Sequence, residues 1–68
     1  MPSATERVAA KIIALRERRG LSQEALAARA SVHRMTIQRL ERAAHPPTLD
    51  TLERIARALG VTLADLVK

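Results

Sequence analysis

The chain has 68 residues, of which 47% are hydrophobic, with no Phe, Trp, Tyr or Cys and a formal net charge of +5 at pH 7. This length supports one domain and is too short for two, because even a single core is small at this size. The absence of cysteine excludes disulfides, thiolate catalysis and the common structural zinc sites. A core of aliphatic side chains and alanines suits packed helices, so we expect one all-α domain over residues 1–68.

The sequence argues against a membrane protein and against an enzyme. No apolar run approaches the roughly 18 residues that span a membrane, and the N-terminus lacks the apolar stretch of a signal peptide. His33 and His45 are too isolated to form a metal site, and no nucleophile with a base, acid pair or glycine-rich phosphate loop is present. We therefore expect a cytoplasmic protein without catalytic activity, metal or cofactor.

Hydroxyl residues ahead of apolar patterns predict where helices begin. Ser3 with Glu6, and Thr62 with Asp65, have the spacing of capping boxes. The two prolines at 46–47 force an extended loop, because neither can donate a backbone hydrogen bond. These patterns predict five helices and no strand, at residues 4–19, 23–30, 34–42, 49–59 and 63–67.

Residues 21–42 contain two short amphipathic patterns joined by residues 30–33, an arrangement typical of a helix-turn-helix. On a helical wheel of the second pattern, one arc carries the apolar Ile37 and Leu40 together with Thr36 and Glu41. The complementary arc is mainly basic and carries Arg34, Met35, Gln38, Arg39 and Arg42. One face therefore has a core to join, and the other is suited to an anionic partner.

Basic charge is concentrated around the third predicted helix. Between residues 29 and 49 the chain has four arginines and one glutamate, whereas residues 50–68 have three basic and three acidic residues. A localised excess of this kind is the electrostatic footprint expected of a nucleic-acid-binding surface. The alternative is a charged helix face that is simply solvated.

Taken in order, these residues resemble the lambda-repressor-like, or Cro/repressor, class of helix-turn-helix proteins, also called the xenobiotic-response-element family. The resemblance runs from about Val8 to Val67. The matching features are Leu15-Arg16, Gly20, Leu21-Ser22-Gln23-Glu24, Leu26-Ala27, Val32, Thr36-Ile37, Leu40-Glu41, the proline loop, Leu52, Ile55-Ala56 and Leu59-Gly60-Val61. The resemblance implies a five-helix DNA-binding domain, of the size of a phage-type repressor or a restriction-modification controller protein.

Three positions depart from the family pattern, all of them at helix ends. Ser31 stands where the turn usually has glycine, at a position that tends to need a left-handed backbone, which costs a non-glycine residue roughly 1 kcal/mol. His33 occupies the usual Ser or Thr cap before the recognition helix, and Ala43 replaces a common glycine after it. These departures bear on helix-end geometry and leave the expected fold unchanged.

The first turns of the second helix of such a motif meet base edges in the major groove. We therefore expect base readout by Arg34, Met35, Gln38 and Arg39. Arginine pairs bidentately with guanine, glutamine with adenine, and an apolar side chain packs on the thymine methyl group. The alternatives are a core position for Met35, a merely solvated Gln38, and phosphate contacts without base preference for the two arginines.

Phosphate contacts are expected around this surface. Gln23 matches the phosphate-contacting glutamine of the family, and a helix N-terminus favours an anion in any case. Thr36 and Arg42 flank the reading surface and are expected to touch phosphate. The resemblance also implies an ion pair between Arg16 and Glu41, which we interpret as structural, with Glu41 orienting Arg16 and making it available to a phosphate.

One recognition helix reads only a few base pairs, so we expect a homodimer on double-stranded DNA. The expected dimer interface is the apolar set Leu49, Leu63, Leu66 and Val67, whose alternative role is to complete the core.

The leading interpretation of the function is a transcriptional regulator that binds a palindromic operator. The second is an antitoxin that holds a toxin protein and regulates its own synthesis. A third is a protein-interaction module or a basic peptide at a membrane surface.

Overall fold

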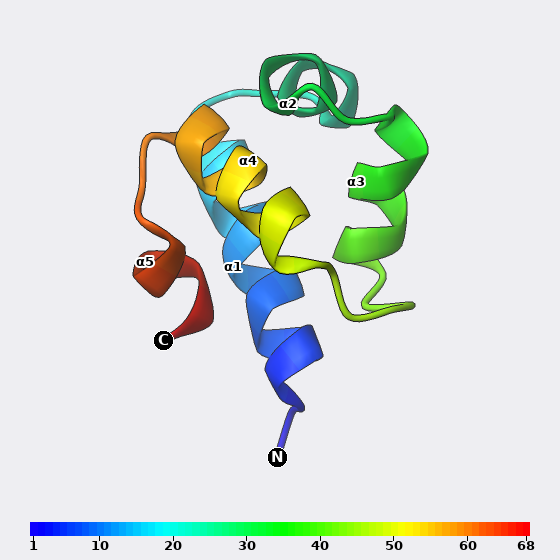
Figure 1. Cartoon of the computed structure of the whole chain (residues 1–68), viewed down its shortest axis with the longest axis vertical. Helices are drawn as coiled ribbons and strands as arrows, with labels where there is room; N and C mark the ends of the chain where they lie inside the picture. The colour runs from blue at the N-terminus through cyan, green and yellow to red at the C-terminus, as the bar shows by residue number, and fades with distance from the viewer.

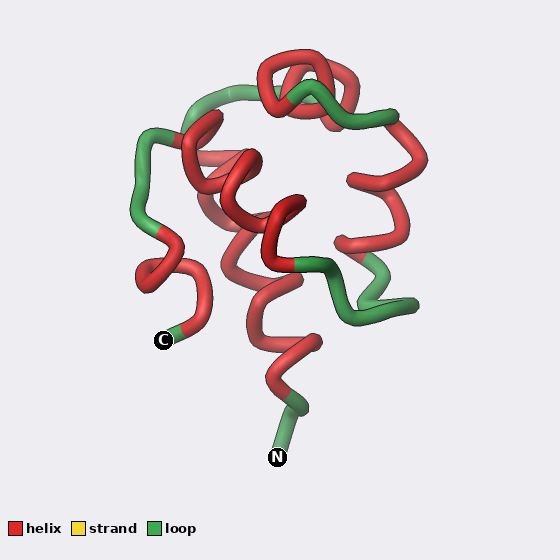
Figure 2. Tube along the Cα trace, in the orientation of Figure 1, coloured by secondary structure: helices red, strands yellow, loops and turns green.

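The computed structural model describes residues 1–68, which form five α-helices and no strand. Figure 2 shows the helices in red and the loops that connect them in green. The helices are α1 (Ala4–Arg18), α2 (Gln23–Ala30), α3 (Arg34–Glu41), α4 (Leu49–Leu59) and α5 (Leu63–Val67). The all-α prediction is confirmed. The helices α1 and α3 end one residue earlier than expected, because Arg19 and Arg42 serve as their C-caps. No helix is both long enough and apolar enough to cross a lipid bilayer.

Four of the five helices begin at a hydroxyl side chain that accepts a hydrogen bond from the amide three residues later, at 3.0 to 3.1 Å. These N-caps are Ser3, Ser22, Thr48 and Thr62. At α1 and α5 the acidic residue at the third helical position reciprocates by accepting from the amide of the cap, which completes both capping boxes. Local sequence thus sets these helix starts.

The helices surround one hydrophobic core. In the view of Figure 1, α4 lies in front of α1, α2 is at the top, and α3 and α5 are on opposite sides. The helix α2 contacts α3 and α4, and α1 contacts α3 and α5. Every helix contributes to a cluster of twelve buried aliphatic residues: Val8, Ile12, Leu26, Ala27, Ala30, Ile37, Leu40, Leu52, Ile55, Ala56, Leu59 and Leu66. No polar or charged residue is fully buried with them. The fold is therefore held mainly by burial of apolar surface.

The C-terminal helix corrects one expectation about the dimer interface. Leu66 is only 1% exposed and belongs to the core, so its assignment to a subunit interface is wrong and the core alternative holds. Leu63 is half-buried and packs against the same core. Leu49 and Val67 remain exposed, at 69% and 48%. Only these last two present a substantial apolar surface to a partner.

Candidate nucleic-acid interface

The helix α3 presents one face to the core and the other to solvent. Ile37 and Leu40 are 0% and 5% exposed and anchor the helix against the rest of the fold. On the opposite face Arg34, Met35 and Arg39 are exposed, whereas Gln38 is half-buried at the edge. The structure therefore brings the four residues expected to read bases onto one accessible surface. The alternative placing Met35 in the core is wrong, because this side chain is 45% exposed.

Arg34 is loosely held. Its Nη1 lies 3.7 Å from Oε1 of Glu24 on α2, and the two side chains are 53% and 75% exposed. Solvent screens such a pair, and exposed ion pairs of this kind contribute about 0 to 1 kcal/mol. The pair leaves the guanidinium available to exchange this carboxylate for a phosphate or a base edge.

The turn before α3 contains the backbone geometry that its sequence predicts. Ser31 has φ 57° and ψ 42°, which confirms the expected left-handed conformation, and its amide donates to the carbonyl of Ala28. His33 caps the next helix by accepting a hydrogen bond from the amide of Met35 at Nδ1, at 3.1 Å. The imidazole of His33 therefore acts as the N-cap acceptor in place of the usual hydroxyl group, and α3 begins at Arg34.

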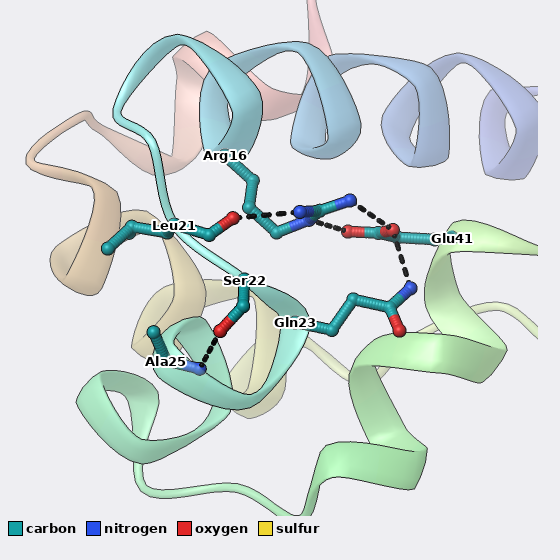
Figure 3. A network of polar contacts seen from close by, with 6 residues as sticks. All are labelled: Arg16, Leu21, Ser22, Gln23, Ala25 and Glu41. Carbon is teal, nitrogen blue, oxygen red and sulfur yellow. Dashed lines mark hydrogen bonds and ion pairs between the residues drawn. The ribbon is translucent and has the colours of Figure 1, made fainter.

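A polar network of Arg16, Gln23 and Glu41 joins α1, α2 and α3, and Figure 3 shows these side chains pointing toward one another. Arg16 in the last turn of α1 donates to both carboxylate oxygens of Glu41 at the end of α3, from Nε to Oε2 at 2.6 Å and from Nη2 to Oε1 at 3.1 Å. The same guanidinium donates through Nη1 to the carbonyl of Leu21 at 2.8 Å. The hydrogen bond to Glu41 raises the pKa of Arg16 above its ordinary value. The arginine therefore stays charged in this network.

Gln23 belongs to the same network, a connection that the sequence did not predict. Its Nε2 donates to Oε1 of Glu41 at 2.9 Å, so the first residue of α2 is tied to the last residue of α3. The two residues are 18 positions apart on different helices, and no spacing rule within one helix connects them. The family resemblance predicted a phosphate contact for Gln23 and an ion pair with Arg16 for Glu41, but no contact between Gln23 and Glu41.

The network limits what Arg16 can do at the DNA. The side chains of Arg16 and Glu41 are only 14% and 7% exposed. All three guanidinium nitrogens of Arg16 already donate within the protein. These bonds hold α3 in place through Arg16 and give no support to the expected phosphate contact of Arg16. Gln23 keeps its place at the N-terminus of α2, where the positive end of the helix dipole favours an anion.

A hollow of about 210 Å³ adjoins the reading face where the loop between α3 and α4 passes α3. Its lining offers hydroxyl, imidazole and guanidinium donors and comprises Thr36, Arg39, Leu40, His45, Pro46, Pro47, Thr48 and Thr51. Such donors suit a phosphate oxygen. Thr36 is among them, half-buried, whereas Arg42 is exposed just after α3. The phosphate contacts of these two residues stay predictions.

Comparison with known proteins agrees with this geometry. Residues 12–66 match the family model HTH_3, described as helix-turn-helix. Over 60 residues the chain is 38% identical to the immunity repressor protein of Bacillus phage phi105. That similarity covers 88% of this chain but only 42% of the phage protein, so the chain spans less than half of that relative.

Solved structures share the whole arrangement of helices. A hypothetical transcription factor NHTF from Neisseria superposes with a TM-score of 0.92 at 28% identity, covering 100% of this chain and 82% of that one. The restriction-modification controller protein C.AhdI from Aeromonas hydrophila gives a TM-score of 0.88 at 27% identity, over 91% and 94% of the two chains. The protein therefore belongs to the helix-turn-helix family HTH_3, a lambda-repressor-like family of DNA-binding transcriptional regulators.

Proposed function

We propose that this protein is a sequence-specific transcriptional regulator that binds a palindromic operator as a homodimer, with α3 in the major groove. The observation that carries the proposal is the two-sided character of α3. Two of its residues, Ile37 and Leu40, are held in the core, and its exposed face begins with a run of base-reading residue types. A helix held rigidly by its back face presents its front face to the groove at a fixed angle.

The residues of this face divide by the kind of contact that each supports. Arg34 and Arg39 have the geometry to pair bidentately with guanine, Gln38 with adenine, and Met35 to pack on a thymine methyl. Phosphate contacts on either side would fix the register on the duplex without specifying sequence. We assign these phosphate contacts to Gln23, Thr36 and Arg42.

The dimer supplies the specificity that one helix lacks. A single recognition helix covers only a few base pairs, whereas a two-fold dimer reads two half-sites about 34 Å apart. Leu49 and Val67 support this part of the proposal, because they are large apolar side chains left 69% and 48% exposed. Leu63 is half-buried and would lie at the edge of such an interface.

The names of the relatives favour a regulator over an antitoxin. One relative is named an immunity repressor and one similar structure a restriction-modification controller protein, and both names are those of regulators. In the antitoxin alternative a toxin would be the main ligand and DNA binding secondary. We therefore propose DNA, and not a toxin, as the main ligand of this protein.

Selection from a pool of random duplex DNA with the purified full chain tests this proposal. We expect enrichment of a two-fold symmetric consensus whose half-site centres lie about one helical turn apart. Binding of the selected duplex should persist at about 150 mM salt, at which purely electrostatic, non-specific binding is greatly weakened. Failure to enrich any sequence would contradict the proposal, and an asymmetric consensus would contradict its dimeric part.

A further inference from the structure

A second hollow lies outside the proposed DNA surface, between the end of α2 and the second half of α4. Figure 1 shows α2 at the end of the molecule towards which α4 runs, and the two helices are in contact. The hollow has a volume of about 370 Å³ and is lined by Arg29, Ala30, Ser31, Arg54, Arg57 and Ala58. Half of the lining residues are arginines, and none comes from α3.

Positive charge in this hollow is only partly compensated. Arg54 pairs with Asp50 one turn earlier, with 3.3 Å between Nε and Oδ2. The side chains of Arg29 and Arg57 form no ion pair and donate no hydrogen bond within the protein. Two unpaired guanidinium groups near each other repel, and an anion placed among them would relieve this repulsion.

Helix dipoles alone do not account for this grouping. Arg29 and Arg57 each lie in the last turn of a helix, where a positive charge complements the dipole. The carbonyls at both helix ends already accept backbone hydrogen bonds, from Ser31 to Ala28 in α2 and from Gly60 to Arg57 in α4. Dipole complementation explains each arginine separately but does not require that both line one hollow with Arg54.

The hollow is connected to the turn of the helix-turn-helix motif. Nη1 of Arg54 donates to the carbonyl of Ser31 at 3.2 Å, and Ser31 is the left-handed residue of that turn. Any ligand that drew the guanidinium of Arg54 towards itself would compete with this carbonyl. The turn leads through His33 directly into α3, so its geometry influences how α3 is presented.

We propose that the hollow binds a small, multiply charged anion bearing phosphate or carboxylate groups, and that binding there lowers the affinity for DNA by drawing Arg54 away from Ser31. Three arginines around one hollow suit such a ligand, because guanidinium groups bind both oxyanions bidentately. The binding part stands on the charge and geometry of the hollow. The regulatory part rests on the proposed function.

Anion binding is tested first, on the full chain without DNA. Inorganic pyrophosphate is titrated at constant ionic strength while amide chemical shifts are followed by NMR. We expect saturable shifts at residues 29–31 and 54–58. Arg29→Gln and Arg57→Gln should each weaken binding about threefold to fivefold. Arg18→Gln is the matched control, since Arg18 is also an exposed arginine in the last turn of a helix but lies outside the hollow.

The outcomes of this titration are distinct. A parallel titration with citrate separates the two ligand types, because tighter binding of pyrophosphate indicates a phosphate ligand and tighter binding of citrate a carboxylate ligand. The anion site is overturned if neither probe saturates or if the shifts are confined to residues 34–42. Equal affinities of Arg57→Gln and Arg18→Gln would overturn it as well.

Coupling to DNA is tested separately, with the selected duplex and pyrophosphate at constant ionic strength. We expect pyrophosphate to lower the operator affinity of the wild type and of Arg18→Gln, and to lower that of Arg57→Gln much less. An equal response of all three proteins would mean direct competition at the DNA face and would overturn the coupling. If the anion binds while no duplex is ever selected, the anion site stands and the proposed function fails.

Discussion

Glu41 is shared by donors from two other helices, since Arg16 binds both of its oxygens and Gln23 binds one. Removing this carboxylate by Glu41→Ala leaves Arg16, only 14% exposed, without its partner. Breaking a largely buried pair on one side costs about 3 to 5 kcal/mol. We expect Glu41→Ala to lower both the free energy of unfolding, measured in urea, and the affinity for the operator.

Two further variants serve as controls for Glu41→Ala. Glu41→Gln retains an oxygen acceptor and should lose less stability than Glu41→Ala, which matters if the alanine variant fails to fold. Glu24→Ala removes only the exposed partner of Arg34 and should change the unfolding free energy by less than about 1 kcal/mol. A Glu41→Ala protein with normal unfolding and intact operator binding would contradict the positioning role of the pair.

Arg39 is the residue at which base readout and phosphate binding are most easily confused, because it lies both on the reading face and in the hollow beside the α3–α4 loop. If it reads a base, Arg39→Ala should relax the consensus at one or two operator positions, at a cost of about 1 to 3 kcal/mol at those positions. Repeating the selection with the variant measures this. A uniform loss across all sequences would make Arg39 a phosphate contact.

The turn between α2 and α3 places a non-glycine residue, Ser31, in a left-handed backbone conformation. Ser31 at φ 57° lies in the region that glycine adopts without strain. We expect Ser31→Gly to raise the unfolding free energy by about 0.5 to 1 kcal/mol. Gly60→Ala is the reciprocal variant at φ 71° with open space around it, and should lower stability by a similar amount. Changes of opposite sign in the unfolding free energy of the two variants, measured in urea, would support this account. A Ser31→Gly protein less stable than the wild type would contradict it.

The capping boxes of α1 and α5 should make stability depend on acid pH. The backbone hydrogen bond from Ser3 holds the pKa of Glu6 below its ordinary value of 4.5, and that from Thr62 holds the pKa of Asp65 below 3.8. Folding favours the charged form of both carboxylates. Their contribution to stability is therefore fully present at a pH above their ordinary pKa values, and it is lost as the pH falls through their lowered pKa values in the folded state.

We therefore expect the melting temperature of the wild type to fall between about pH 5 and pH 3. The double variant Glu6→Gln with Asp65→Asn should show a smaller fall over this range. Glu53→Gln, which removes an exposed carboxylate outside both boxes, should behave as the wild type does. Identical curves for the double variant and the wild type would show that the boxes do not contribute.

The helices were predictable because their start signals are local. At four of them a hydroxyl residue and the amide that it caps are three positions apart, and at α3 His33 and the amide of Met35 are two apart, so the sequence places them without knowledge of the fold. The bond from Gln23 to Glu41 was not predictable, because it depends on how α2 and α3 pack. Leu66 was ambiguous for a related reason, since a helix of five residues is too short for its apolar face to be identified from spacing.

At the scale of the whole molecule, Leu49 and Val67 are large apolar side chains that stay exposed outside the proposed DNA surface. Leu49→Glu and Val67→Glu should leave the melting temperature of the subunit nearly unchanged, because both side chains are largely exposed. Each should shift sedimentation equilibrium towards monomer and weaken operator binding. Ala10→Glu adds the same charge to an exposed position of α1 and serves as the control. Unchanged association in both interface variants would contradict the proposed dimer surface.

The twelve-residue core is wholly aliphatic, and this has a consequence for how such a protein diverges over time. Hydrophobic side chains of similar volume replace one another at little cost, because none carries a directional bond that a successor must reproduce. A lineage is therefore free to exchange core residues while the backbone stays in place, in keeping with 28% identity at a TM-score of 0.92. Arg16, Gln23 and Glu41 have no such freedom, and substitutions among these three should be the ones that descendants tolerate least.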